Sequence, residues 1–172
     1  MAVNLSGTIS VGFNVTDQRT LVSGAAPQVG SITSLFSAAF SIVSGIAAGQ
    51  CDKAWCDSRS VNASATDTLD FAGVVTDAFG AVVTFAKIRG IVIAAAAANV
   101  SVLTITRPAS NGILLFGAIS QTIAGLSAGG IFAWVDPQVG LSVTPATVDL
   151  LTVVNGAGGT AIYQIGVVGT SA

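Results

Sequence analysis

Apolar and polar residues alternate along the first part of the chain. Between residues 3 and 13, the odd positions hold Val, Leu, Ile, Phe or Gly, and the even positions hold Asn, Ser, Thr or Gly. Alternation of this kind is typical of a strand that buries one face. We therefore predict a strand over residues 3–13.

Residues 32–46 fit two patterns. The serines at positions 34, 37, 41 and 44 follow a helical spacing, whereas the apolar residues at positions 36, 38, 40 and 42 alternate as in a strand. Because Ser, Phe, Ile and Val are all indifferent helix formers, the strand is favoured.

The remainder of the chain consists of short apolar stretches separated by Gly, Pro, Asn and Asp, which are turn-forming residues. These stretches predict strands at 54–61, 65–71, 82–95, 100–106, 112–116, 130–135, 148–154 and 160–168. The glycine-rich residues 155–159 separate the last two, and we expect a hairpin there. Many short strands with turns between them indicate an all-β fold, an antiparallel β-sandwich or jelly roll. Residues 31–172 would form this domain, and residues 1–30 a strand followed by a loop or an N-terminal arm.

Composition indicates a surface that is poor in charge. Charged residues make up 8% of the 172 residues and hydrophobic residues 52%, whereas soluble domains carry about 25% charged residues. Most charges lie between positions 52 and 89, and only Asp136 and Asp149 follow Arg107. Small residues or a partner subunit must therefore cover much of the surface. We predict an obligate oligomer or a component of a protein lattice.

The same numbers argue against membrane and nucleic-acid partners. The longest apolar run near the middle of the chain covers residues 91–98, whereas a spanning helix needs about 20 apolar residues. No basic segment precedes an apolar core near the amino terminus, so we expect synthesis in the cytoplasm without a signal peptide. The net charge of -2 and the scattered Lys and Arg residues give no basis for binding phosphates.

Little in the sequence points to catalysis. The chain lacks His and Glu, so a Ser or Cys nucleophile would have no ordinary base. Cys51 and Cys56 are too few for a structural zinc site, and a disulfide between them would require the segment to bend. Two reduced thiols are favoured. We expect no enzymatic activity, no metal and no cofactor.

Two pairs of residues are candidates for contacts with other molecules. Lys87 and Arg89 alternate with Ile88, so both would point from the outer face of a strand and form a polar contact strand. Trp55 and Trp134 could form an aromatic interface or a platform for sugars, and packing in the core or in an interface is favoured. A tight turn over residues 76–80 would set the register of the strand that carries Lys87 and Arg89.

Three parts of the sequence resemble small virion proteins of tailed bacteriophages. They are residues 49–59 with 63–73, residues 76–80 with 84–89, and residues 149–155 with 163–171. They keep their order and are spread over about two thirds of the chain. The first 48 residues match nothing in that family, and the glycine-rich residues 125–130 replace a more polar segment.

The resemblance implies a jelly-roll cement protein, which decorates and stabilises a capsid. It implies a homotrimer on the capsid exterior that binds the major capsid protein and is made in the host cytoplasm. It brings no catalytic residues. The alternative is a tail, spike or fibre component with a receptor- or glycan-binding β-domain.

Overall fold

The computed structural model describes residues 4–13, 19–20, 29–30, 36–77, 79–117 and 121–172. It divides the chain into two compact units: an amino-terminal unit, Gly7–Ser41, and a sandwich unit, which comprises Met1–Ser6 and Ile42–Ala172. Within the described ranges, no helix has the length and apolar character needed to cross a membrane.

The amino-terminal unit contains a two-stranded ribbon. Strand β1 (Gly7–Phe13) lies next to β4 (Phe36–Ser44), and β2 (Arg19–Thr20) pairs antiparallel with β3 (Val29–Gly30). Strand β4 continues into the sandwich unit, where its last residues pair parallel with β5 (Gln50–Cys51). The strand expected within residues 32–46 is thus confirmed, and the one expected over 3–13 begins at Gly7.

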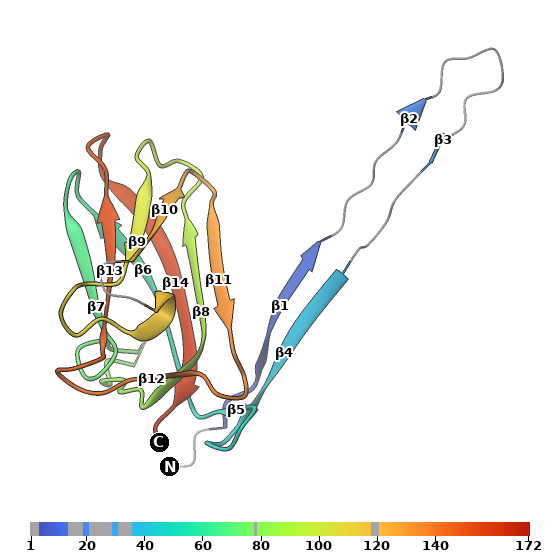
Figure 1. Ribbon diagram of the computed structural model, residues 1–172, viewed down its shortest axis with the longest axis vertical. Coiled ribbons are helices and arrows are strands. Elements are labelled where there is room, and N and C mark those ends of the chain that lie inside the picture. The colour runs from blue at the N-terminus through green and yellow to red at the C-terminus, as the bar shows by residue number, and fades with distance from the viewer. Residues whose placement is uncertain (1–3, 14–18, 21–28, 31–35, 78, 118–120) are drawn as a thin grey trace. The chain divides into compact units, whose positions relative to one another are not determined.

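The sandwich unit is built from two antiparallel sheets (Figure 1). The five-stranded sheet has the order β11-β8-β14-β6, with β12 paired to β8, and the four-stranded sheet has the order β10-β9-β13-β7. Their bounds are β6 Lys53–Val61, β7 Thr66–Asp70, β8 Lys87–Ala95, β9 Leu103–Thr106, β10 Thr122–Leu126, β11 Ile131–Val135, β12 Leu141–Ser142, β13 Leu150–Asn155 and β14 Ala161–Thr170.

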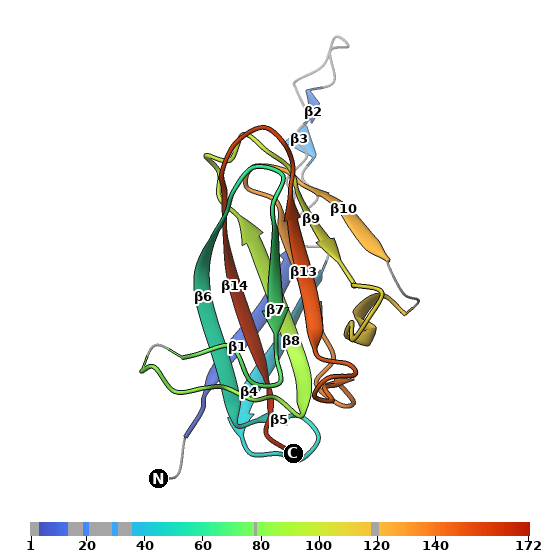
Figure 2. The same cartoon turned by 90° about the vertical axis from the view of Figure 1, so that its left-hand side faces the viewer.

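The strand pairs of the sandwich are nested along the sequence. Strand β6 pairs with β14, β7 with β13, β8 with β11, and β9 with β10, all antiparallel. Several successive strands therefore lie in opposite sheets, as the labels in Figure 2 show for β6 and β7 and for β13 and β14. Nested pairing across two sheets is the topology of a jelly roll. The predicted fold class is confirmed.

The expected hairpin at residues 155–159 is wrong. Strand β13 pairs with β7 and β9, whereas β14 pairs with β6 and β8, so this loop crosses from one sheet to the other. The buried Asn155 holds the crossing, because its Nδ2 group donates to the carbonyl oxygens of Val61, Asn62 and Gly159 at 2.9, 3.0 and 2.7 Å. Turn composition predicts where a chain reverses, but not which strand it joins next.

Three other strand predictions differ from the structure. Residues 114–116 form a short 3-10 helix in place of a strand, and β8 begins at Lys87, later than the expected position 82. Strand β10, Thr122–Leu126, includes the first two residues of the glycine-rich stretch 125–130, which suggested a turn. Gly125 lies in this strand with φ +82° at a break in register with β9, and a glycine at such a position is typical of a β-bulge.

Aliphatic side chains from the inward positions of both sheets form the core. The inward residues of β13 and β14, including Leu151, Val153, Tyr163, Ile165 and Val167, are all at most 3% exposed. Their outward neighbours are half-buried or exposed. The period of two in the sequence therefore corresponds to the two faces of each sheet.

Truncating a core side chain should destabilise the sandwich. We expect Leu151→Ala to lower the free energy of unfolding by about 2–5 kcal/mol, because it removes buried methyl groups and leaves a cavity. Val139→Ala, at a residue that is 69% exposed, should change it by less than about 0.5 kcal/mol. Urea denaturation followed by circular dichroism measures both, and equal losses would contradict the assignment of the core.

Candidate interaction surface

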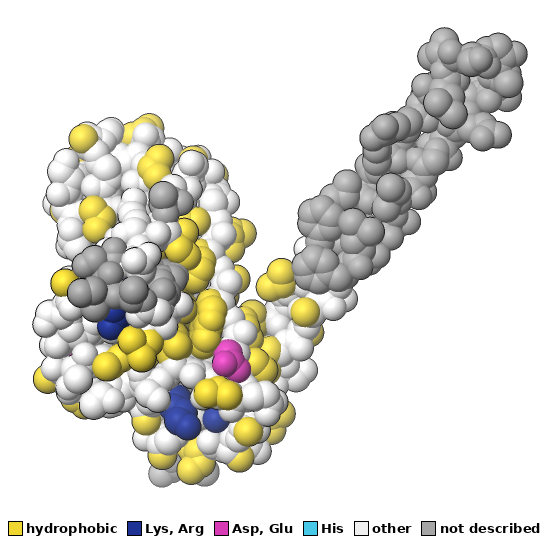
Figure 3. Space-filling model, in the orientation of Figure 1, with side chains coloured by type: hydrophobic (Ala, Val, Ile, Leu, Met, Phe, Trp, Pro, Cys, Tyr) yellow, Lys and Arg dark blue, Asp and Glu magenta, His cyan; other side chains and the backbone are white. Residues whose placement is uncertain are grey.

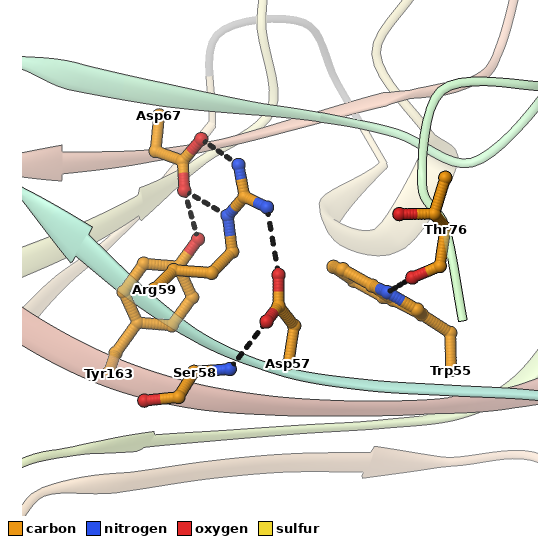
Figure 4. A network of polar contacts seen from close by, with 7 residues as sticks. All are labelled: Trp55, Asp57, Ser58, Arg59, Asp67, Thr76 and Tyr163. Atoms are coloured by element: carbon orange, nitrogen blue, oxygen red, sulfur yellow. Dashed lines mark hydrogen bonds and ion pairs between the residues drawn. The ribbon is translucent and has the colours of Figure 1, made fainter. Parts of the chain in front are cut away.

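Trp55 belongs to the core and not to an aromatic interface. This β6 residue is 2% exposed and packs edge-on against Phe71, with ring centroids 6.4 Å apart. Its indole N–H donates to the carbonyl oxygen of Thr76 at 3.0 Å (Figure 4). Trp134 in β11 pairs with the inward Ile91 and is half-buried against the core. For Trp55, core packing is therefore the correct one of the two interpretations.

The outward orientation expected of Arg89 is also wrong. Its side chain is 2% exposed and donates hydrogen bonds to the main-chain carbonyl oxygens of Ile46, Ala47 and Gln50. The alternation that suggested an outer face is interrupted beside it, where β8 shifts register against β14. Lys87 is half-buried. Arg89 thus fastens a loop of its own chain.

The two cysteines are free and lie in different surroundings. Cys51 is buried, and this burial raises the pKa of its thiol above the ordinary value, although Arg89 opposes the change. Cys56 is exposed on β6. Among the residues that the structure describes, no three His, Cys, Asp or Glu side chains lie close enough to hold a metal ion.

A polar network joins the two sheets at the β6–β7 side of the sandwich (Figure 4). Arg59 of β6 forms a bidentate contact with Asp67 of β7, Nε to Oδ2 at 2.5 Å and Nη2 to Oδ1 at 2.8 Å. Its Nη1 also reaches Asp57 Oδ2 at 3.0 Å. The hydroxyl of Tyr163 in β14 donates to Asp67 Oδ2 at 2.7 Å.

The network sets the protonation of its members. Burial alone would raise the pKa of the Asp67 carboxyl, but the hydrogen bonds from Arg59 and Tyr163 outweigh it and lower the pKa below the ordinary value. Burial and the bond to Asp67 raise the pKa of Tyr163. Both oxygens of the Asp67 carboxylate accept hydrogen bonds from Arg59 or Tyr163. The network therefore links the two sheets, and the Asp67 carboxylate is used for this structural contact and not as an acid or base.

An exposed apolar hairpin lies between β7 and β8. The Phe79 hairpin, defined here as residues 74–82, carries three strongly exposed apolar residues, Val74 at 70%, Phe79 at 95% and Val82 at 58%. Its base is anchored by Val75 and Val83, which are both 6% exposed and joined by a hydrogen bond from Val83 N to Val75 O at 2.8 Å.

The tip of the Phe79 hairpin is held by Asp77. The carboxylate oxygen Oδ1 accepts hydrogen bonds from the backbone N–H groups of Phe79 and Ala81, both at 2.9 Å. The main chain adds bonds from Asp77 N to Ala81 O and from Gly80 N to Asp77 O, at 2.8 and 3.0 Å. Gly80 adopts a φ of +80°, which a side chain would strain. The described residues of the turn expected near residues 76–80 are therefore held by hydrogen bonds, and Phe79 is exposed there.

A groove of about 490 Å³ runs beside this hairpin. Its lining combines apolar residues, among them Leu5, Ala54, Trp55, Phe79, Val82 and Val83, with the charged residues Asp52, Lys53 and Asp77. The exposed apolar hairpin and the groove suit contact with another protein. Elsewhere on the molecule charges are also scarce, as on the face drawn in Figure 3, where few Lys, Arg or Asp atoms interrupt the yellow and white surface.

Sequence reasoning overlooked Phe79 as a contact residue. It recognised the turn but directed attention to the basic residues after it. The available signal was an aromatic residue within a turn, where polar residues are usual.

A scan against protein-family models and searches of curated proteins and of solved structures find no match for this chain.

Removing the charge of Asp67 should weaken the fold in a pH-dependent way. The folded-state pKa of Asp67 is lowered, so its contribution is complete above the unfolded-state pKa, about 4, and is lost as the pH falls through the folded value. We expect Asp67→Asn to lower the free energy of unfolding at pH 7 by about 1–2 kcal/mol. The difference from wild type should shrink below pH 4.

Urea titrations at several pH values measure this difference. Asp57→Asn is the matched control, because Asp57 is more exposed and makes a single contact with Arg59. It should change stability by less than about 1 kcal/mol. A difference for Asp67→Asn that does not vary with pH would contradict the role of the Asp67 carboxylate.

Proposed function

We propose that this chain is a structural virion protein that decorates the capsid of a tailed bacteriophage and binds its major capsid protein. The observation that carries the proposal is the Phe79 hairpin, in which an almost fully exposed Phe79 lies between the exposed Val74 and Val82 and the turn is held by its own hydrogen bonds. The jelly-roll fold, the scarcity of charge and the resemblance of the sequence to phage virion proteins support it. The protein would act as a homotrimer on the outside of the shell.

Adhesion without ion pairs is physically sufficient for this role. Full burial of a Phe side chain contributes about 1.5–3 kcal/mol, and neighbouring apolar area adds about 25 cal/mol per Å². A turn that is already ordered loses little conformational entropy on binding. In a trimer, three such contacts would act together, and their combined affinity would far exceed that of one contact.

The proposal is tested by adding the protein to capsids that lack it. We expect Phe79→Ser to weaken binding by about tenfold or more per site, because it removes most of the apolar area at the tip. Phe79→Leu should retain most of the binding. The control is Val100→Ser, because Val100 is also strongly exposed (77%) but lies outside the Phe79 hairpin. It should bind as the wild type does.

Two results would contradict the proposal. One is a wild-type protein that does not bind the shell, and the other is a folded Phe79→Ser variant that binds with unchanged affinity. The copy number in purified virions separates the alternative role. Hundreds of copies per particle are expected for a shell protein, and a handful would indicate a tail, spike or fibre component.

A further inference from the structure

The outer face of the five-stranded sheet is unusual in composition. The register of the four long strands identifies its outward positions as Ala54, Cys56, Ser58 and Ser60 on β6, Ile162, Gln164, Gly166 and Val168 on β14, Gly90, Val92 and Ala94 on β8, and Ile131, Ala133 and Val135 on β11. None of these positions holds a charged residue, and the first charge on this face is Lys87 at the start of β8, which pairs with Thr170 of β14. Only two serines and one glutamine are polar.

A solvated sheet face normally alternates polar residues with the apolar residues of the core. Strands β8 and β14 instead read as nearly continuous apolar runs, such as residues 91–95, which is typical of strands that are buried on both faces. The inner face of this sheet packs against the core. The composition of the outer face therefore indicates that it is also covered.

The four-stranded sheet provides an internal comparison. Its outward positions include Thr68 on β7, Thr152 on β13, Thr106 on β9 and Thr122 on β10, which lie side by side in register. Their hydroxyls take part in hydrogen bonds, for example Thr152 Oγ1 to Thr106 O at 2.9 Å. This face thus carries the polar side chains that are usual on a solvent-facing sheet. The apolar outer face is therefore a property of one sheet and not of the whole sandwich.

The shape of the outer face suits a second copy of the same face. A shallow groove of about 560 Å³ crosses it, lined mostly by small residues that include Cys56, Val92 and Gly166, and Asp57 also contributes to the lining. Two larger residues stand beside the groove, Ile131 at 68% exposure and Ile162 at 47%. A surface that carries both a groove and protruding side chains can be complementary to itself.

The area is sufficient for a specific contact. Four strands about 4.8 Å apart, each contributing about seven residues at about 3.4 Å per residue, span about 450 Å². Protruding side chains add to this, so two copies would bury about 1,000 Å² in total, which is the size at which specific interfaces begin. We infer that the outer face of the five-stranded sheet is a contact between copies of this chain. A self-complementary face joins copies in pairs, so this contact is separate from the one that would hold the proposed homotrimer, and the inference does not depend on capsid binding.

The oligomeric mass tests the inference directly. Light scattering and sedimentation of the full chain should show an oligomer at micromolar concentration. We expect Val92→Asp to weaken association about 100-fold or more, because it would bury an unpaired carboxylate in the apolar middle of the interface. Thr152→Asp places the same group on the outer face of the other sheet and should leave the mass unchanged.

Cys56 supplies a second measurement, since its thiol lies within the outer face and is exposed in a single copy. Maleimide labelling, located by mass spectrometry, should be slow at Cys56 in the wild-type oligomer and fast in Val92→Asp. Circular dichroism establishes that both aspartate variants are folded. Phe79→Ser should keep the oligomeric mass, so a failure of capsid binding is distinguishable from a failure of this interface.

Three outcomes would overturn the inference. They are a monomeric wild-type protein, an unchanged mass for the folded Val92→Asp variant, and full labelling of Cys56 within the intact oligomer. If the wild-type protein is monomeric and the Val92→Asp variant no longer binds the capsid, the outer face contacts the capsid and not a second copy of the chain.

Discussion

Burial of aliphatic side chains between the two sheets is the interaction on which the sandwich depends. The chain has few charges and few aromatic residues, so Val, Ile and Leu at inward positions supply most of its apolar area. That area is buried only if the strands pair in the nested order in which β6 meets β14 and β7 meets β13. The loops, the polar network and the exposed hairpin all take their positions from this arrangement.

Buried polar groups then hold the connections around the core. Asn155 binds the crossing between β13 and β14, Arg89 holds residues 46–50, and Arg107 donates from Nε to the carbonyl oxygens of Gly112 and Ile113. Each donates to two or more main-chain carbonyl oxygens. Together with Arg59, which binds Asp67, three of the five basic residues in the sandwich unit are engaged within the chain, which leaves little charge for contacts with other molecules.

The surface that remains is suited to apolar contact in two separate places. The Phe79 hairpin offers a small protruding element, and the outer face of the five-stranded sheet offers a flat one. The hairpin fits a partner with a hollow, and the sheet face fits a copy of itself. In the proposed role, the hairpin would contact the capsid and the sheet face would contact a second copy of the chain.

The sequence by itself determined the class of the fold and the places of most strands. Alternation with a period of two depends on neighbouring residues alone, and so do turn residues such as those at 76–80. The resemblance to phage virion proteins also comes from the sequence, and it stays a prediction.

Only the tertiary structure decided which strands pair, where Arg89 and Trp55 point, and which apolar residues stay exposed. Arg89 turned inward because a register shift beside β14 interrupts the alternation, and Trp55 is buried because Phe71, distant from it in sequence, packs against its ring. Phe79 is exposed because Asp77 holds the turn away from the core. The positions of Arg89 and Trp55 depend on contacts with segments that are farther away along the chain, which a local pattern does not reveal. The exposure of Phe79, in contrast, arises within a local turn, where an aromatic residue was the available signal.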